Sequence, residues 1–260
     1  SGLAFSADGT KMFVTGDIGD DVNEYTLSTG FDVSSASFVD SFSVRSQDTL
    51  PTGLAFNSDG TKMFVTGGAD DDINEYTLST AFDVSTASFV DSFDVSSQDT
   101  TPMGLAFNTD GTKMFVIGWA GSDVNEYTLT TGFDVSTASF VDSFDVSSQD
   151  SIPSGLAFNT DGTKMFVEGY TGSDVNEYTL TTGFDVSTAS FVDSFSVLSQ
   201  EKFPLGLAFN TDGTKMFVMG AYGDDVNEYS LVSPYSLINV TGEHDGDVLG
   251  DDTDADGDSL

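Results

Sequence analysis

One unit of sequence is repeated five times along this chain. The segment "GLAFNTDGTKMFV" occupies residues 104–116 and returns at 155–167 and 206–218, with close variants at 2–14 and 53–65. The glycines that open the copies lie 51 residues apart, at Gly2, Gly53, Gly104, Gly155 and Gly206. A fixed period of this length indicates stacked or radially arranged units, because no single unit buries its apolar face alone.

Each unit predicts four strands. In the second copy, residues 53–56 and 62–65 flank an Asp-Gly turn and form a hairpin. Residues 72–78 and 88–95 alternate apolar with polar side chains and predict two more strands. Pro51 precedes the first strand, which we expect to begin after it. No window has a helical period.

Four antiparallel strands per 51-residue unit predict an all-β fold, a β-propeller of five blades over residues 1–233. A β-solenoid fits less well, because its coils are shorter and carry fewer hairpin signals. All of the 23 phenylalanines except Phe203 recur at fixed places in the unit, so the repeated rings predict the core. The ring is either closed in this chain or an open, truncated part of a larger propeller.

The repeat carries a resemblance to a known family. The pattern "P-x-G-L-A-F-N-x-D-G-T-K-M-F-V" followed by "D-V-N-E-Y-T-L" resembles the YVTN-type propeller repeat of lactonase-like and surface-layer proteins, from Gly2 to about Leu231. The insert "TTGFDVSTASF" makes the second half longer than that family's usual blade. The resemblance implies a propeller, and lactonase-like members use carboxylates around a central channel.

The last 27 residues, 234–260, leave the repeat. Either residues 235–240 supply the fourth strand of the fifth blade, or that strand lies upstream of Ser1. From Val248 to Leu260 the chain resembles the opening of cadherin-like or VCBS-type domains of bacterial surface proteins, with Gly250-Asp251 where that family usually has Ala-Asn.

In the same tail, the acidic residues have the spacing found at the start of a calcium-binding loop. Alternating carboxylates suit a hard cation, and the candidate ligands are Asp252, Asp254, Asp256 and Asp258. The sequence stops before the loop position that takes a bidentate Glu. The alternatives are therefore a flexible acidic linker and, in an intact protein, a calcium site.

The formal net charge of −36, with seven basic residues, argues against a nucleic-acid partner. The acidity serves either solubility in a salty medium or divalent-cation binding. No apolar run is long enough to span a membrane, and there is no cysteine. These features and the two resemblances predict a monomeric module of a larger extracellular or bacterial cell-surface protein.

Catalytic candidates are few. The chain has one histidine, His244, and one arginine, Arg45, so a nucleophilic triad is hard to assemble. The repeated acids are expected to be structural, with a ring of acidic metal sites as the alternative; they are Asp21, Asp72, Asp123, Asp174, Asp225, Glu24, Glu75, Glu126, Glu177 and Glu228. We expect the Asp set to accept backbone N–H groups, and the repeated lysines to balance the Asp of the nearby turn.

The copies differ in two links, between the second and third strands and between one blade and the next. Because the chain reverses at each connection of an antiparallel blade, both links must emerge on the same face of the disc. The candidate ligand-binding residues on this divergent face are Trp119, Tyr170, Tyr222, Met103, Ile152, Phe203 and Glu168. Neutral drift of the loops is the competing explanation.

The predicted function is therefore non-catalytic binding or adhesion within a large secreted bacterial surface protein, with a glycan or a protein as ligand. A lactonase-like hydrolase with carboxylates near the channel is one alternative. A purely structural spacer between neighbouring domains is another.

Overall fold

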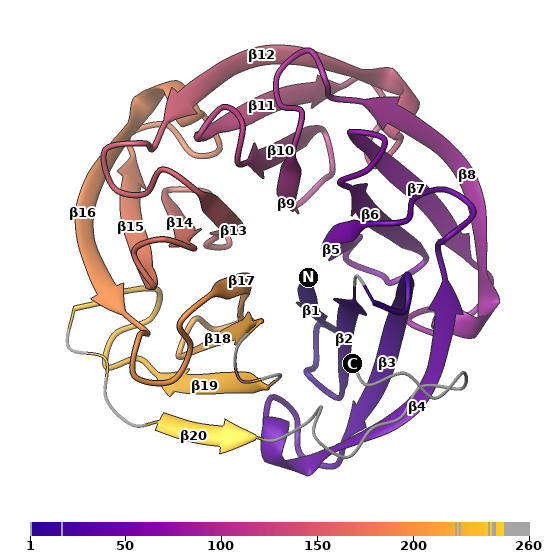
Figure 1. The fold of residues 1–260 in the computed structure, drawn as a ribbon, viewed down its shortest axis with the longest axis horizontal. Helices are drawn as coiled ribbons and strands as arrows, with labels where there is room; N and C mark the ends of the chain where they lie inside the picture. Colours follow the sequence, from indigo (N-terminus) through magenta and orange to yellow (C-terminus); the bar gives the residue numbers. More distant parts are fainter. Residues whose placement is uncertain are drawn as a thin grey trace.

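The computed structural model describes residues 2–16, 18–221, 223, 225–238, 240 and 243–246, the last four by their backbone alone. The predicted fold is confirmed: five four-stranded antiparallel sheets stand around a central axis as the blades of a propeller (Figure 1). In each blade the strands follow one another from the axis to the rim in sequence order, so the hairpin of the repeated "GLAF" and "KMFV" is innermost.

The strands have nearly the same bounds in every blade. The first blade contains β1 (Leu3–Phe5), β2 (Lys11–Gly16), β3 (Asp21–Leu27) and β4 (Ala36–Ser43). The second contains β5 (Pro51–Phe56), β6 (Lys62–Gly67), β7 (Asp72–Leu78) and β8 (Ala87–Asp94). The third contains β9 (Pro102–Phe107), β10 (Lys113–Gly118), β11 (Asp123–Leu129) and β12 (Ala138–Asp145).

The fourth blade contains β13 (Pro153–Phe158), β14 (Lys164–Gly169), β15 (Asp174–Leu180) and β16 (Ala189–Ser196). The fifth contains β17 (Pro204–Phe209), β18 (Lys215–Gly220), β19 (Val226–Ser230) and β20 (Glu243–Gly246). Before the outer strand of the first four blades lies one turn of 3-10 helix, at η1 (Val33–Ser35), η2 (Val84–Thr86), η3 (Val135–Thr137) and η4 (Val186–Thr188).

Two local features differ from expectation. The inner strands of blades two to five begin at the proline and not after it; Pro51, for example, lies opposite Gly67. Proline fits there because the first residue of a strand need not donate to the ladder. The outer strands of the first four blades also carry a bulge: in the second blade Phe89 lies opposite Tyr76 and Asp91 opposite Glu75, which leaves Val90 as the extra residue.

The fifth blade takes its outer strand from later in the chain than predicted. β20 pairs antiparallel with β19, whereas the part of 235–240 that the structure describes is not a strand. Tyr235 has φ of +50° and its N–H donates to the Gly213 carbonyl at 2.8 Å. It therefore takes the place that Phe82 has in the second blade, which keeps this segment in the connection.

The ring closes on itself, which settles the alternative of an open ring. Phe5 of the first blade packs on Phe217 of the fifth, with ring centroids 4.5 Å apart. The Lys215 Nζ donates to the Phe31 carbonyl at 2.6 Å, and the Thr211 hydroxyl donates to the Ala7 carbonyl at 2.7 Å. The first and fifth blades thus share the ring contact and the lysine-to-carbonyl bond of the other neighbours, without exchanging a strand.

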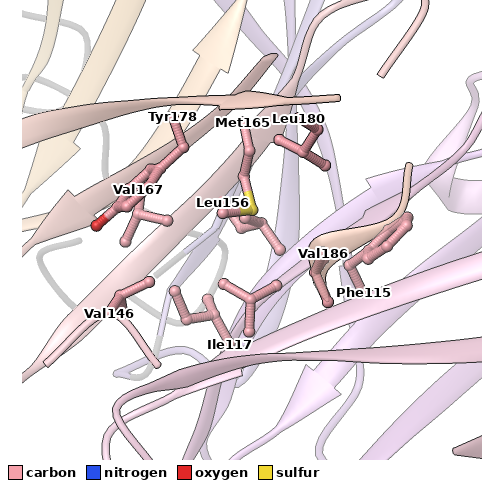
Figure 2. Packing of buried hydrophobic residues seen from close by; sticks show 10 residues of the cluster. Phe115, Ile117, Val146, Leu156, Met165, Val167, Tyr178, Leu180 and Val186 are labelled. Carbon is pink, nitrogen blue, oxygen red and sulfur yellow. The ribbon is translucent and has the colours of Figure 1, made fainter. Parts of the chain in front are cut away.

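The core lies between blades. In the cluster of Figure 2, Phe115 and Ile117 of the third blade face Met165, Val167 and Tyr178 of the fourth, and all five side chains are buried. Equivalent clusters fill the other four blade interfaces. Burying one such side chain stabilises the fold by about 1.5–3 kcal/mol, but only when the neighbouring blade is present.

The Asp-Gly turn is held in place by an aromatic residue. Gly60 has φ of +70°, a conformation that L side chains rarely adopt, and a Cβ there would collide with the ring of Phe82. Phe82 itself has φ of +55°, and its N–H donates to the Gly60 carbonyl at 2.9 Å. The turn and the later connection therefore depend on each other, which explains why every copy has both the Asp-Gly pair and an aromatic residue in the connection.

The repeated lysine forms a link between blades and not the expected balance of the turn Asp. Lys62 lies 2.6 Å from the carboxylate of Glu75 in its own blade and donates to the Phe133 carbonyl of the next at 2.6 Å. The second oxygen of Glu75 accepts the N–H of Val135, also in the next blade, at 3.0 Å. The Lys–Glu pair recurs in all five blades, at 2.6–2.7 Å.

We predict that Glu126→Gln lowers the free energy of unfolding by about 2 kcal/mol, because it leaves the Lys113 ammonium without its counter-ion at a largely buried site. Urea unfolding measures the change. The control Asp142→Asn, at an exposed carboxylate of the same blade, should change it by less than about 0.5 kcal/mol. Equal effects of the two substitutions would contradict the inter-blade role.

Candidate ligand-binding face

The two variable links lie together on one face of the propeller, as predicted. The N–H of each second-to-third-strand link donates to a carbonyl of the inter-blade link beside it. The four bonds join Gly68 to Leu50 at 2.9 Å, Trp119 to Thr101 at 3.0 Å, Tyr170 to Ile152 at 3.1 Å and Ala221 to Phe203 at 3.0 Å. The side chains that vary between copies are therefore gathered on the divergent face.

A constant buried acid supports each pair of loops. The carboxylate of Asp99 accepts the N–H groups of Thr101 at 2.6 Å and Gly121 at 2.9 Å. Asp48, Asp150 and Glu201 hold the equivalent position, and all four acids are at most 3% exposed. These acids were not predicted from the sequence because they lie within links that vary, although "SQD" or "SQE" is present in every one.

The divergent face is hollowed by a pocket of about 250 Å³. Its wall combines residues of both links with residues from the start of the inner strands, and none of them is charged. They are Leu50, Pro51, Thr52, Gly68, Thr101, Met103, Trp119, Tyr170, Leu205 and Ala221. Four of the five blades contribute, each with different side chains, so the pocket does not have the symmetry of the ring.

Three of the predicted site residues, Met103, Trp119 and Tyr170, line this pocket, and a fourth, Phe203, contacts one of them. Trp119 and Tyr170 lie with their ring centroids 5.5 Å apart, tilted by 51°. Phe203 stacks on the other side of Tyr170 at 5.0 Å, and Met103 lines the pocket floor. We call Trp119, Tyr170 and Phe203 the aromatic row. These side chains therefore lie on one face, and Tyr170 contacts both Trp119 and Phe203 directly.

The remaining predicted residues are placed differently. Ile152 joins the loop hydrogen bonds by its backbone, and its side chain does not line the pocket. Tyr222 and the tail residues Asp252, Asp254, Asp256 and Asp258 lie outside the residues that the structure describes, as does Val248 to Leu260 as a whole. Within the described part of the chain, no group of three or more His, Cys, Asp or Glu side chains is placed to hold a metal ion.

Glu168 is buried between blades. Its side chain is 0% exposed, Oε2 lies 3.4 Å from the Ser154 hydroxyl, and Oε1 has no hydrogen-bond partner in the described structure. At the equivalent position of the repeat, the other four copies have Thr15, Thr66, Ile117 and Met219. Burial raises the pKa of the Glu168 carboxyl well above its ordinary value, with a smaller contribution in the same direction from the Glu201 charge.

The pocket sits at one mouth of a narrow central channel. Thr52, Met103 and Leu205 form its floor, and Ser154 is the fourth member of that ring. Beneath them the inner-strand glycines and leucines close the channel to about 20 Å³. The opposite mouth holds hollows of about 290 and 350 Å³, lined by the repeated residues of the "AFNT" turns. Their asparagines already bond within the turn, as Asn159 does to Thr163 at 3.2 Å.

The repeated Asp at the start of the third strand has a partner other than the one we expected. In each copy its carboxylate accepts a hydrogen bond from the side-chain amide of the Asn two residues later, at 2.6–3.0 Å. Burial raises the pKa of Asp72 to about 6, and raises the pKa values of Asp123 and Asp174 as well. Arg45 pairs with Asp20 at 3.0 Å.

The pocket residues that are neither aromatic nor sulfur-containing were not predicted from the sequence. Thr52 and Leu205 occupy the same repeat position as Met103, directly before the Gly of the inner strand's "GL" pair, and Ser154 holds this position in the fourth copy. The position differs in each of these four copies, so its variation was a usable signal. Of this position, only Met103 was taken as a candidate, so the ring to which the pocket floor belongs was not predicted.

No protein-family model matches this chain, and neither does any curated protein. Solved structures do match. A 6-phosphogluconolactonase-like protein of Bacteroides uniformis, named as such provisionally, has a TM-score of 0.57 at 12% identity, over 93% of this chain and 70% of that one. The periplasmic gluconolactonase of Pseudomonas aeruginosa has a TM-score of 0.54 at 15% identity, over 95% and 70%.

A chain of a nidogen–laminin complex is similar to the same degree, with a TM-score of 0.56 at 14% identity over 93% of this chain and 82% of that one. At these identities the likeness concerns the propeller fold alone. The neighbours include proteins named as lactonases and a protein from a binding complex. In the described part of the chain, no helix is long and apolar enough to cross a membrane.

We predict that Glu168→Gln stabilises the protein increasingly as pH rises from about 5 to 8. The raised pKa means that the neutral carboxyl fits the fold, so its contribution is complete below the ordinary pKa of 4.5 and is lost as pH rises toward the folded value. The loss amounts to at most about 1.4 kcal/mol per pH unit. Urea unfolding of both proteins across this range measures the difference.

Gln keeps the shape of the side chain without the ionisation, and every other acid is common to the two proteins, so the difference isolates Glu168. Thr66→Val, at the same place in the second blade, serves as the control and should show no pH-dependent difference. A constant offset between Glu168→Gln and the wild type at all pH values would show that Glu168 ionises normally in the fold.

Proposed function

We propose that this propeller is a non-catalytic binding or adhesion module of a secreted bacterial surface protein, and that a glycan or protein ligand seats in the axial pocket of the divergent face. One observation carries the proposal. Side chains that differ from blade to blade converge on a single uncharged, aromatic-walled pocket of about 250 Å³. Ligand pockets typically combine such apolar walls with a few polar groups.

The support beneath the loops favours binding over neutral drift. Drift would vary loop residues independently of where they point, yet the acids that hold the backbone are constant while the side chains above them change. A rigid backbone with exchangeable side chains limits the entropy lost when a ligand binds. Trp and Tyr are also the residues that contribute most to binding energy at interfaces.

The pocket wall favours binding over hydrolysis. The wall has no carboxylate, histidine or lysine to act as a general acid or base, and Tyr170 is its one titratable residue. Glu168 lies beneath the floor with its side chain 0% exposed, out of reach of a bound substrate. The lactonase names of two similar structures are consistent with the fold and do not bear on this pocket.

We predict that the double substitution Trp119→Ala and Tyr170→Ala lowers ligand capture at least tenfold on arrays of bacterial and host glycans and cell-surface proteins. Both side chains are partly exposed, so the urea midpoint should change little. Phe89→Ala, at a 45% exposed ring on the outer strand β8, is the matched control and should retain capture. Unchanged capture by the double variant, or hydrolysis of gluconolactone by the wild type, would contradict the proposal.

A further inference from the structure

The pocket of the divergent face lies in a strongly negative surrounding. Asp48 and Asp99 each accept the N–H of a residue that lines the wall, Leu50 and Thr101 respectively, so their charges lie directly behind it. Asp150 and Glu201 stand in the same relation to the neighbouring loops. Charges that are buried in this way are screened less by salt than charges in water.

Among the residues that the structure describes, no cation lines the wall of the pocket. Lys202 lies outside the wall, over the ring of Phe203. The five repeated lysines are at the start of the second strand of each blade, the end beside the Asp-Gly turns, where each pairs with its own glutamate. Arg45 pairs with Asp20. With a formal charge of −36 over the whole chain, the potential at the pocket disfavours phosphate and other anions.

The aromatic row already holds one cation. The ammonium of Lys202 lies over the ring of Phe203, 5.0 Å from its centroid. Phe203 continues through Tyr170 to Trp119, so the two rings in the pocket belong to the same row. Trp and Tyr faces attract ammonium groups through the ring quadrupole, most strongly when the cation is shielded from water.

We propose that the pocket between Trp119 and Tyr170 binds a substituted ammonium group, carried by the glycan or protein ligand. Apolar substituents would pack on Met103, Leu50 and Leu205, and the positive charge would face the rings. The proposal rests on the binding function proposed above and names the group of the ligand that enters the pocket. It also predicts that binding weakens as salt is raised, because part of the attraction is the field of the acids.

Trp119 is the single tryptophan of the chain, so intrinsic fluorescence reports on this pocket directly. The probes are choline, its uncharged isostere 3,3-dimethylbutan-1-ol, and inorganic phosphate, each titrated into the full chain. We expect saturable quenching or enhancement by choline, at least tenfold weaker binding of the isostere, and none of phosphate. Tyr170→Phe should retain choline binding, and Tyr170→Ala should weaken it about tenfold or more.

The result separates the two proposals. Equal affinities for choline and its isostere, binding of phosphate, or no response to choline would each overturn the ammonium site. If the isostere binds and Tyr170→Ala abolishes this binding, the pocket function survives without the preference for charge. If Tyr170→Ala leaves the binding of every probe unchanged, the probes do not bind in this pocket, and the proposed binding function of the pocket is wrong. Phe89→Ala controls for nonspecific aromatic effects.

Discussion

The contact between neighbouring blades is the constraint on which the rest of the structure depends. Each blade has a buried apolar face that only the next blade can cover, and the Lys–Glu pair fixes that neighbour by bonding two of its backbone groups. The first and fifth blades share the lysine bond and the ring contact, so closure needs no exchanged strand. Because every unit contacts similar neighbours, most residues at these interfaces are the same in every copy, with the position of Glu168 as an exception.

The side chains of the divergent face are not subject to this constraint. Once the inner hairpin and the blade interfaces are fixed, the two variable links need only a support for their backbone, which the buried acids provide. Their side chains can then differ from blade to blade. A ring of five similar units thereby gains one asymmetric pocket, with Trp119 and Tyr170 of the aromatic row in its wall and a floor of three different residues.

Much of this was predictable from the sequence. The period, the four strands of each blade, the innermost hairpin and the common face of the variable links all follow from spacing and alternation within one unit. The Lys62–Phe133 bond joins residues far apart in sequence, and the burial of Glu168 depends on Gly155 and Leu207, so neither follows from local pattern. The strand at Glu243–Gly246 was not predicted. Tyr235 takes the place of the phenylalanine in the connection of the earlier copies, so the outer strand of the fifth blade begins only after this connection.

The central claim is that the repeat builds the scaffold and the variable links build the site. The most direct measurement transfers the second blade's link, Gly68 to Asp71, into the equivalent positions 119–122 and 170–173, which have the same length. Urea unfolding and choline titration by calorimetry then follow both properties in one protein. The account predicts an unfolding midpoint close to that of the wild type and loss of binding. Retained binding, or a protein that no longer folds, would contradict it.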